Sequence, residues 1–139
     1  MHRRPLGRGR ILALFAAALI LVGSLLPWYG VGGAGGLPAT DLRPFDGTGM
    51  LAFLAALAVI ALVALPYAAG DRPVGADRTL AYGMLFAVAA LGVVLWPLDL
   101  LEFAAGLLPD RAPGFWLAVG GTAVLGRAVY DIAREPERR

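Results

Sequence analysis

The sequence contains no cysteine, lysine, asparagine or glutamine, and it has one histidine, His2, and one serine, Ser24. Without cysteine the chain forms no disulfide bond and offers no thiol nucleophile and no thiolate ligand for a metal. The single histidine lies in an arginine-rich tail, so imidazole catalysis and histidine-based metal sites lack the residues they require. We therefore expect no cofactor, no metal and no catalytic residues: the chain is predicted not to be an enzyme.

Polar surface is also scarce. Charged residues make up 16% of the 139 residues, against roughly 25% in typical soluble domains, and 59% of the residues are hydrophobic. A soluble helical bundle would show a polar face at the helical period of 3.6 residues. Residues 50–70 show no such face, because they are apolar on every side. The composition therefore predicts one integral membrane domain rather than a soluble fold.

The charges fall in short islands between long apolar stretches, each close to the roughly 20 residues that cross a bilayer as a helix. The first stretch is longer than the apolar region of a typical signal peptide and no clear cleavage site follows it, so we expect it to be retained. Arg127 falls inside the last stretch, where a long side chain reaches the headgroups. The predicted fold is all-α, a single bundle over residues 1–139 with transmembrane helices near residues 11–28, 49–67, 79–96 and 114–130 and tails at 1–10 and 131–139.

The arginines predict the orientation. Four precede the first helix, two lie in the loop 71–78 and four lie at the C-terminal end, whereas the other side holds only Arg43 and Arg111 beside five acidic residues. Cytoplasmic loops carry the positive excess, so both termini are predicted to be cytoplasmic in a bacterial inner membrane. Aromatic residues near the predicted helix ends agree with an interfacial belt. Those at the outer ends are Trp28, Tyr29, Trp96, Phe115 and Trp116, and those at the inner ends are Tyr67, Tyr82 and Tyr130.

The two outer loops have different compositions. Residues 29–48 are rich in glycine and proline, which predicts irregular chain. Residues 98–108 are apolar on most sides, with Asp99 and Glu102 one turn apart, which predicts a short helix lying in the membrane interface. Asp99, Glu102 and Arg111 form a candidate polar cluster on the outer face. Cation sites need several converging oxygen ligands, so a solvated helix face is the favoured interpretation of the two acids.

Small residues recur at every fourth position of the last helix, at Gly114, Ala118, Thr122 and Gly126. Stripes of this kind let helix backbones approach closely in lipid, where no hydrophobic force drives helices together. We interpret these four residues as a helix-packing surface, used within the bundle in preference to a dedicated oligomer face.

The chain resembles a group of uncharacterised small four-helix membrane proteins of high-G+C bacteria such as actinobacteria. The resemblance rests on Leu26-Pro27-Trp28-Tyr29 after the first helix, a glycine-rich outer loop, and Gly114-Phe115-Trp116-Leu117 opening the fourth helix. The Trp-Glu pair that closes the first loop in that group is replaced here by Arg43-Pro44-Phe45-Asp46. The resemblance implies the four-helix architecture and no particular activity.

Three functional hypotheses follow. The favoured one is a structural or accessory subunit that acts through helix association, with the lipid bilayer and with copies of itself or a larger membrane complex as partners, and with no nucleic acid. The second is a protein that binds or transports a small molecule or lipid in a cavity between the helices. The third is a membrane enzyme at the outer interface, using Asp99, Glu102 and Arg111. No ionisable residue lies near the middle of a predicted helix, which argues against ion-coupled transport.

Overall fold

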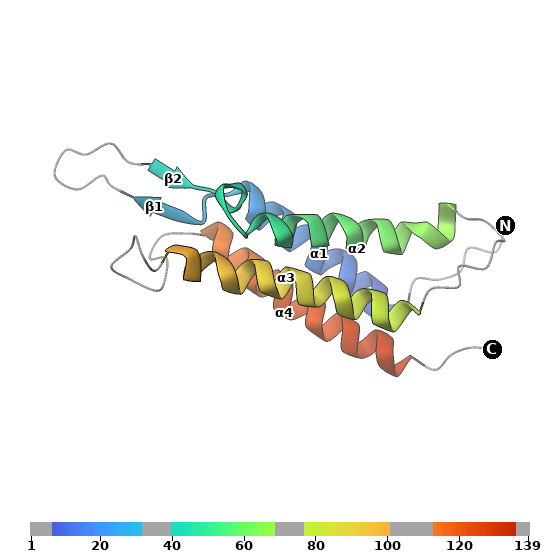
Figure 1. Cartoon of the computed structure of the whole chain (residues 1–139). Coiled ribbons are helices and arrows are strands. Elements are labelled where there is room, and N and C mark those ends of the chain that lie inside the picture. The colour runs from blue at the N-terminus through green and yellow to red at the C-terminus, as the bar shows by residue number, and fades with distance from the viewer. Residues whose placement is uncertain (1–6, 32–39, 69–76, 101–112, 136–139) are drawn as a thin grey trace.

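The computed structural model describes residues 7–31, 40–68, 77–100 and 113–135, and the described chain forms four helices and one short β-hairpin (Figure 1). The predicted all-α architecture of four helices is confirmed, with the hairpin as an addition. The helices are α1 (Arg8–Leu25), α2 (Met50–Ala68), α3 (Arg78–Leu100) and α4 (Pro113–Arg134). The strands are β1 (Tyr29–Val31) and β2 (Thr40–Leu42), and a 3₁₀ turn, η1 (Pro44–Asp46), precedes α2.

Helix α1 is displaced toward the N-terminus relative to the predicted range 11–28. It ends at Leu25 because Leu26 stands before Pro27, and a residue before proline is forced out of the helical region. Leu26 accordingly has extended backbone angles, φ −90° and ψ 156°. At the other end, Arg8 and Arg10 belong to the helix rather than to the predicted tail. Charged residues mark the end of the apolar stretch, but the helix itself can continue through them.

Helices α3 and α4 are both longer than predicted. Asp77 begins α3, because its carboxylate accepts hydrogen bonds from the backbone N–H groups of Thr79 and Leu80, at 3.0 and 3.3 Å. The helix then continues through Pro97 to Leu100, beyond the predicted end at residue 96. Helix α4 continues past the predicted end at residue 130 to Arg134. The predicted interfacial helix at 98–108 overlaps α3 at 98–100, and its other residues lie outside the described ranges.

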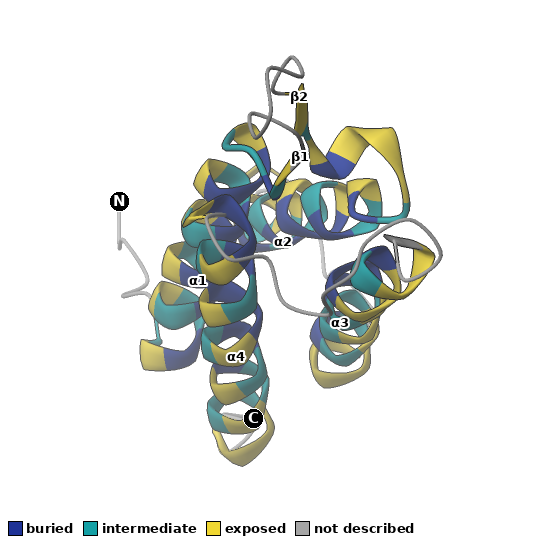
Figure 2. Ribbon diagram, turned by 90° about the vertical axis from the view of Figure 1, so that its left-hand side faces the viewer, coloured by how far each residue is buried: buried dark blue, intermediate teal, exposed yellow. Residues whose placement is uncertain are grey.

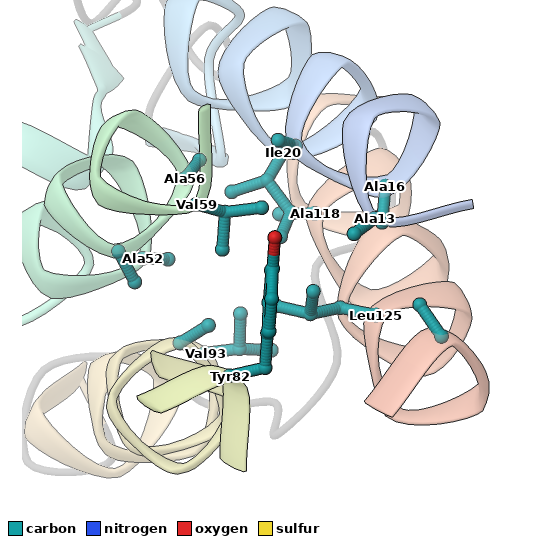
Figure 3. Close-up of a cluster of buried hydrophobic side chains, with 14 of the residues drawn as sticks. Ala13, Ala16, Ile20, Ala52, Ala56, Val59, Tyr82, Val93, Ala118 and Leu125 are labelled. Carbon is teal, nitrogen blue, oxygen red and sulfur yellow. The ribbon is translucent and has the colours of Figure 1, made fainter. Parts of the chain in front are cut away.

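The helices form a ring in which each one packs on its neighbours in the sequence and α4 closes the ring on α1 (Figure 2). The contact between α1 and α4 is by far the most extensive of the four. Successive helices run in opposite directions, so α1 and α4 are antiparallel (Figure 1). The core between the helices consists of small and medium side chains, among them Ala13, Ala56, Val59 and Leu125 (Figure 3).

Three helices, α1, α2 and α3, are long and apolar enough to cross a membrane. Their outward faces carry large apolar side chains, such as Phe15 at 57% exposure, Leu54 at 48% and Met84 at 62%. Such a surface is suited to lipid and is compatible with a membrane protein. Helix α4 does not meet the same criterion among the described residues, because its glycines and Arg127 lower its hydropathy, and Asp131 and Arg134 follow in its last turn.

The loop predicted to be irregular contains the hairpin. Strands β1 and β2 are antiparallel, with Tyr29 opposite Leu42 and Val31 opposite Thr40. The backbone N–H of Trp28 adds a further hydrogen bond to the Leu42 carbonyl at 2.9 Å. The prediction was wrong here because strands of three residues are too short to show an alternating pattern. The many glycines between them are typical of irregular chain and do not indicate strands.

Candidate functional site

Near the hairpin end of the bundle, the backbones of α4 and α1 lie in close contact. A Cβ atom added to Gly114 would lie 2.6 Å from the carbonyl oxygen of Gly23, and one added to Gly23 would lie 2.7 Å from the carbonyl oxygen of Gly114. Ala118 is fully buried beside this contact, its backbone nitrogen 2.8 Å from the same added atom on Gly23. No residue larger than glycine fits at either position without separating the helices.

The close approach continues along the pair. A Cβ added to Gly121 would lie 2.7 Å from Cγ1 of Ile20 and 3.0 Å from both the Ala16 carbonyl oxygen and the Ile20 backbone nitrogen. Near the other end, a Cβ added to Gly9 would lie 3.3 Å from the carbonyl oxygen of Ala128. The sequence interpretation missed Gly9, Gly23 and Gly121. Their signal in the sequence is a spacing that alternates between four and three, in which all residues but Ile20 and Leu125 are small. It comprises Gly9, Ala13, Ala16, Ile20 and Gly23 on α1, and Gly114, Ala118, Gly121, Leu125 and Ala128 on α4.

The four small residues predicted to share a packing surface turn out to face different neighbours. Gly114 and Ala118 lie against α1, whereas a Cβ on Gly126 would meet the ring of Phe86, on α3, at 2.9 Å. Thr122 is buried between them, at 7% exposure, and its hydroxyl donates to the Ala118 carbonyl at 2.8 Å. Each step of four residues overshoots a full turn by about 40°, so three steps rotate the series by about 120°. A constant spacing of four therefore passes from one neighbouring helix to the next.

An aromatic cluster joins three helices at the end of the bundle that carries the hairpin. Trp28 is fully buried and makes edge-to-face contacts with Trp96 of α3, at 5.2 Å between centroids, and with Phe115 of α4, at 5.5 Å. The indole N–H of Trp28 donates to the Gly23 carbonyl at 2.9 Å. Trp28, Trp96 and Phe115 lie at the predicted end of the bundle, but all three are buried and so do not form an exposed interfacial belt. The exposed aromatic residues described at this end are Trp116, at 50% exposure, and Phe45, at 40%.

The predicted polar cluster of Asp99, Glu102 and Arg111 is described only at Asp99, since residues 102 and 111 lie outside the described ranges. Asp99 is exposed and accepts a hydrogen bond from the Thr48 hydroxyl at 2.9 Å, which links the start of α2 to the end of α3. Asp46 accepts a hydrogen bond from the backbone N–H of Arg43 at 2.8 Å. Asp46 thus contacts the backbone of Arg43 at the start of η1.

Charged and aromatic side chains gather at the opposite end. Arg127 pairs with Asp131 at 3.2 Å, and the guanidinium groups of Arg127 and Arg134 lie 5.3 and 4.2 Å from the centroid of the Tyr130 ring. These contacts join residues of one helix, α4, and favour its extended C-terminal turns.

Within the described ranges, no three acidic or histidine side chains converge as metal ligands would. Comparisons with family models, with curated proteins and with solved structures found no match to this chain. The resemblance to small actinobacterial membrane proteins therefore stays an expectation.

Proposed function

We propose that the chain is a bacterial inner-membrane protein with four spanning helices and cytoplasmic termini, which acts without catalysis as a structural or accessory subunit through helix association. The observation that carries the proposal is the antiparallel contact of α1 and α4 along their whole length. This contact supports α4 as part of the membrane domain and supports its opposite face as a surface for another protein.

Helix α4 lies beside α1 from one end of the bundle to the other. Its first turn lies against the end of α1, where Gly114 meets Gly23, and a Cβ on Gly7 would lie against the Glu135 carboxylate. The 18 residues of α1 extend over about 27 Å, close to the hydrocarbon thickness of roughly 30 Å. If α1 crosses the bilayer, α4 crosses beside it. Arg127, whose side chain is 66% exposed, lies in the last two turns and reaches the headgroups from there.

The charges support the orientation. Among described residues, the end of the bundle with the helix termini Arg8 and Arg134 holds five arginines, and the hairpin end holds one, Arg43. The five are Arg8, Arg10, Arg78, Arg127 and Arg134. The excess of arginine favours the first end as the cytoplasmic one.

The outward face of α4 supports association. The large apolar side chains that cover α1, α2 and α3 are missing from the middle of this face, where Gly120 and Ala123 are exposed. Nothing lies within 4 Å of a Cβ added to Gly120. A surface of small residues lets a further transmembrane helix approach closely. Gly114 and Ala118 do not serve this purpose, because α1 covers them.

Site-specific photo-crosslinking tests the association role. Because the chain has no cysteine, Gly120→Cys carries one attachment point for a benzophenone maleimide on α4, and Leu54→Cys carries one on the lipid-facing side of α2. In intact membranes we expect Gly120→Cys to give a protein adduct of discrete mass and Leu54→Cys to give lipid adducts only. Lipid adducts alone from both positions would contradict the association role.

A further inference from the structure

Two arginines near the C-terminal end of α4 converge on one aromatic ring. The guanidinium carbon of Arg134 lies 4.2 Å from the centroid of the Tyr130 ring, and that of Arg127 lies 5.3 Å from it. Flat guanidinium groups stack favourably on aromatic rings, so the ring holds two cations close together. We call these three residues the α4 arginine cluster.

The cluster faces away from the bundle. Steps of three and four residues separate its members, which places them on one side of the helix. That side is exposed: the Arg127 side chain is 66% exposed, Tyr130 is 44% exposed and Arg134 is exposed as well (Figure 2). Ala128, on the side of α4 that contacts α1, is fully buried. The two guanidinium groups are therefore accessible to a ligand outside the bundle.

The cluster lies where the apolar surface of the bundle ends. Gly9 of α1 packs beside Ala128 and Ile132 of α4, so the cluster is level with the first turn of α1. The charges of α1 end at Arg10, and the apolar residue Ile11 follows at 53% exposure. If α1 crosses the bilayer, the cluster lies at the depth of the lipid headgroups, where tyrosine and arginine side chains are favoured.

The positive charge of the cluster is only partly balanced. Asp131 pairs with Arg127 at 3.2 Å, and this is the only ion pair within the described ranges. The adjacent acid, Glu135, lies beside Gly7 at the start of α1. Two guanidinium groups thus share one carboxylate, and the cluster presents a net positive charge to its surroundings.

We propose that Arg127 and Arg134, held by the Tyr130 ring, bind the phosphate of an anionic phospholipid in the inner leaflet. Guanidinium groups donate paired hydrogen bonds to phosphate oxygens. The ring positions both groups before the lipid arrives, which lowers the entropic cost of binding. Basic residues at the cytoplasmic ends of membrane helices suit anionic headgroups. The inference rests on the membrane placement and orientation in the proposed function, but not on the association role.

Native mass spectrometry of the full-length chain in detergent tests the lipid preference. Phosphatidylglycerol and phosphatidylcholine with identical acyl chains are titrated separately into the protein, so that the two lipids differ in the headgroup alone. One arginine near a membrane surface contributes about a fivefold preference for anionic lipid, and we expect phosphatidylglycerol to bind more tightly by at least about that factor. Equal binding of the two lipids would overturn the inference.

Arginine variants locate the site. Arg134→Gln removes one exposed guanidinium group and should weaken phosphatidylglycerol binding about fivefold without lowering the melting temperature. Arg127→Gln should weaken it at least as much, since it also leaves the Asp131 carboxylate unpaired beside the site. The matched control Arg78→Gln removes the same charge at the same end of the bundle, from the start of α3, and should bind as the unmodified chain does. Equal losses for Arg134→Gln and Arg78→Gln would show an effect of net charge alone and overturn the site.

Tyrosine variants test the role of the ring. Tyr130→Leu keeps both arginines but removes the ring that holds them, so the lipid must immobilise them itself. We expect binding of phosphatidylglycerol to weaken roughly three- to tenfold. The matched control Tyr67→Leu changes a tyrosine at the same end of the bundle that is 54% exposed, and should have no effect. Unchanged binding by Tyr130→Leu would contradict a site formed by the cluster.

Two further measurements separate this inference from its alternatives. Glycerophosphoglycerol, the headgroup without acyl chains, should bind far more weakly than the lipid, and equal binding would show a site for a soluble anion, against the inference. Release of the chain from membranes by alkaline carbonate would contradict the membrane placement as a whole. Retention in the membrane with no preference for phosphatidylglycerol would contradict the lipid site alone.

Discussion

The two sides of α4 show different ways of joining helices. Toward α1, glycine residues bring backbone against backbone, as at Gly114, where an added Cβ would lie 2.6 Å from the Gly23 carbonyl oxygen. Toward α3 the contact is smaller, and a side chain mediates it, since Gly126 receives the ring of Phe86. A main-chain neighbour cannot move away without bending the helix, whereas an aromatic ring can rotate.

The difference matters because lipid does not drive helices together by the hydrophobic effect. Close packing stabilises the pair of α1 and α4, while α3 is held by α2, where an added Cβ on Gly92 would meet the Ala52 backbone nitrogen at 2.7 Å. The looser side leaves the middle of the bundle to longer side chains such as Tyr82. We therefore expect the contact of α4 with α1 to be rigid and its contact with α3 to be adaptable.

The largest effect is expected at the aromatic cluster, which ties α3 to the pair at the hairpin end. Trp28→Ala removes a fully buried ring, its contacts with Trp96 and Phe115 and its hydrogen bond to Gly23. Such truncations cost about 3–5 kcal/mol. The melting temperature in detergent should fall sharply for Trp28→Ala and little for Trp116→Ala, whose ring is half exposed. Similar losses for both would mean that the cluster does not hold the helices together.

An adjacent pair of glycines tests the tight side. Gly121→Ala places a methyl group 2.7 Å from the Ile20 side chain and 3.0 Å from main-chain atoms of α1, and should destabilise the protein by about 1–3 kcal/mol. Gly120→Ala adds the same group in open space and should stabilise the helix by roughly 0.5–1 kcal/mol. Thermal unfolding of the two variants should therefore move in opposite directions. A shift of the same sign and size would show that α1 and α4 are not in backbone contact.

Gly126→Ala tests the looser side in the same way. Its methyl group would meet the Phe86 ring rather than main chain, and rotation of that ring relieves the overlap. We expect a change within about 1 kcal/mol, smaller than that of Gly121→Ala. If Gly126→Ala is the more damaging of the two, the contrast between the sides of α4 is reversed.

The smallest effect is expected at the outer carboxylate. Asp99→Asn keeps an acceptor for the Thr48 hydroxyl in an exposed position, so stability should change by less than about 0.5 kcal/mol. Membrane insertion, measured by carbonate extraction, should be unaffected. A variant that fails to accumulate in the membrane would give Asp99 a role that the exposed hydrogen bond does not explain.

The positions of the helices, which depend on long stretches of sequence, were predictable. The ends of the helices and the directions of single side chains, which depend on individual residues, were not. Uncharged runs located all four helices because a span must be apolar over many residues. The end of α1 was placed too late, although Pro27 marks it directly, and the extension of α3 through Pro97 was not foreseen. The inward direction of Trp28 depends on the turn at Pro27 and on the rings of two later helices, which no local pattern encodes.

The small-residue pattern gives the same lesson at finer scale. A spacing of four identified Gly114 and Ala118, which do contact α1, but it grouped them with Gly126, which contacts α3. A glycine allows a close contact only where another helix lies opposite it. The sequence therefore predicted that small residues form the packing surface, but not which small residues these are. Glu102 and Arg111 lie outside the described ranges, and their predicted cluster stays a prediction.

The measurement that tests the account most directly is the topology of α4, the helix whose charged last turns set it apart from the other three. Reporter fusions after Pro109 and after Arg134 bracket this helix, and fusions after Arg10, near Gly35 and near Gly75 bracket the others. We expect the fusions at 10, 75 and 134 to report the cytoplasm and those at 35 and 109 to report the outside. Fusions at 109 and 134 that report the same side would contradict a membrane-spanning α4, and with it the four-span bundle.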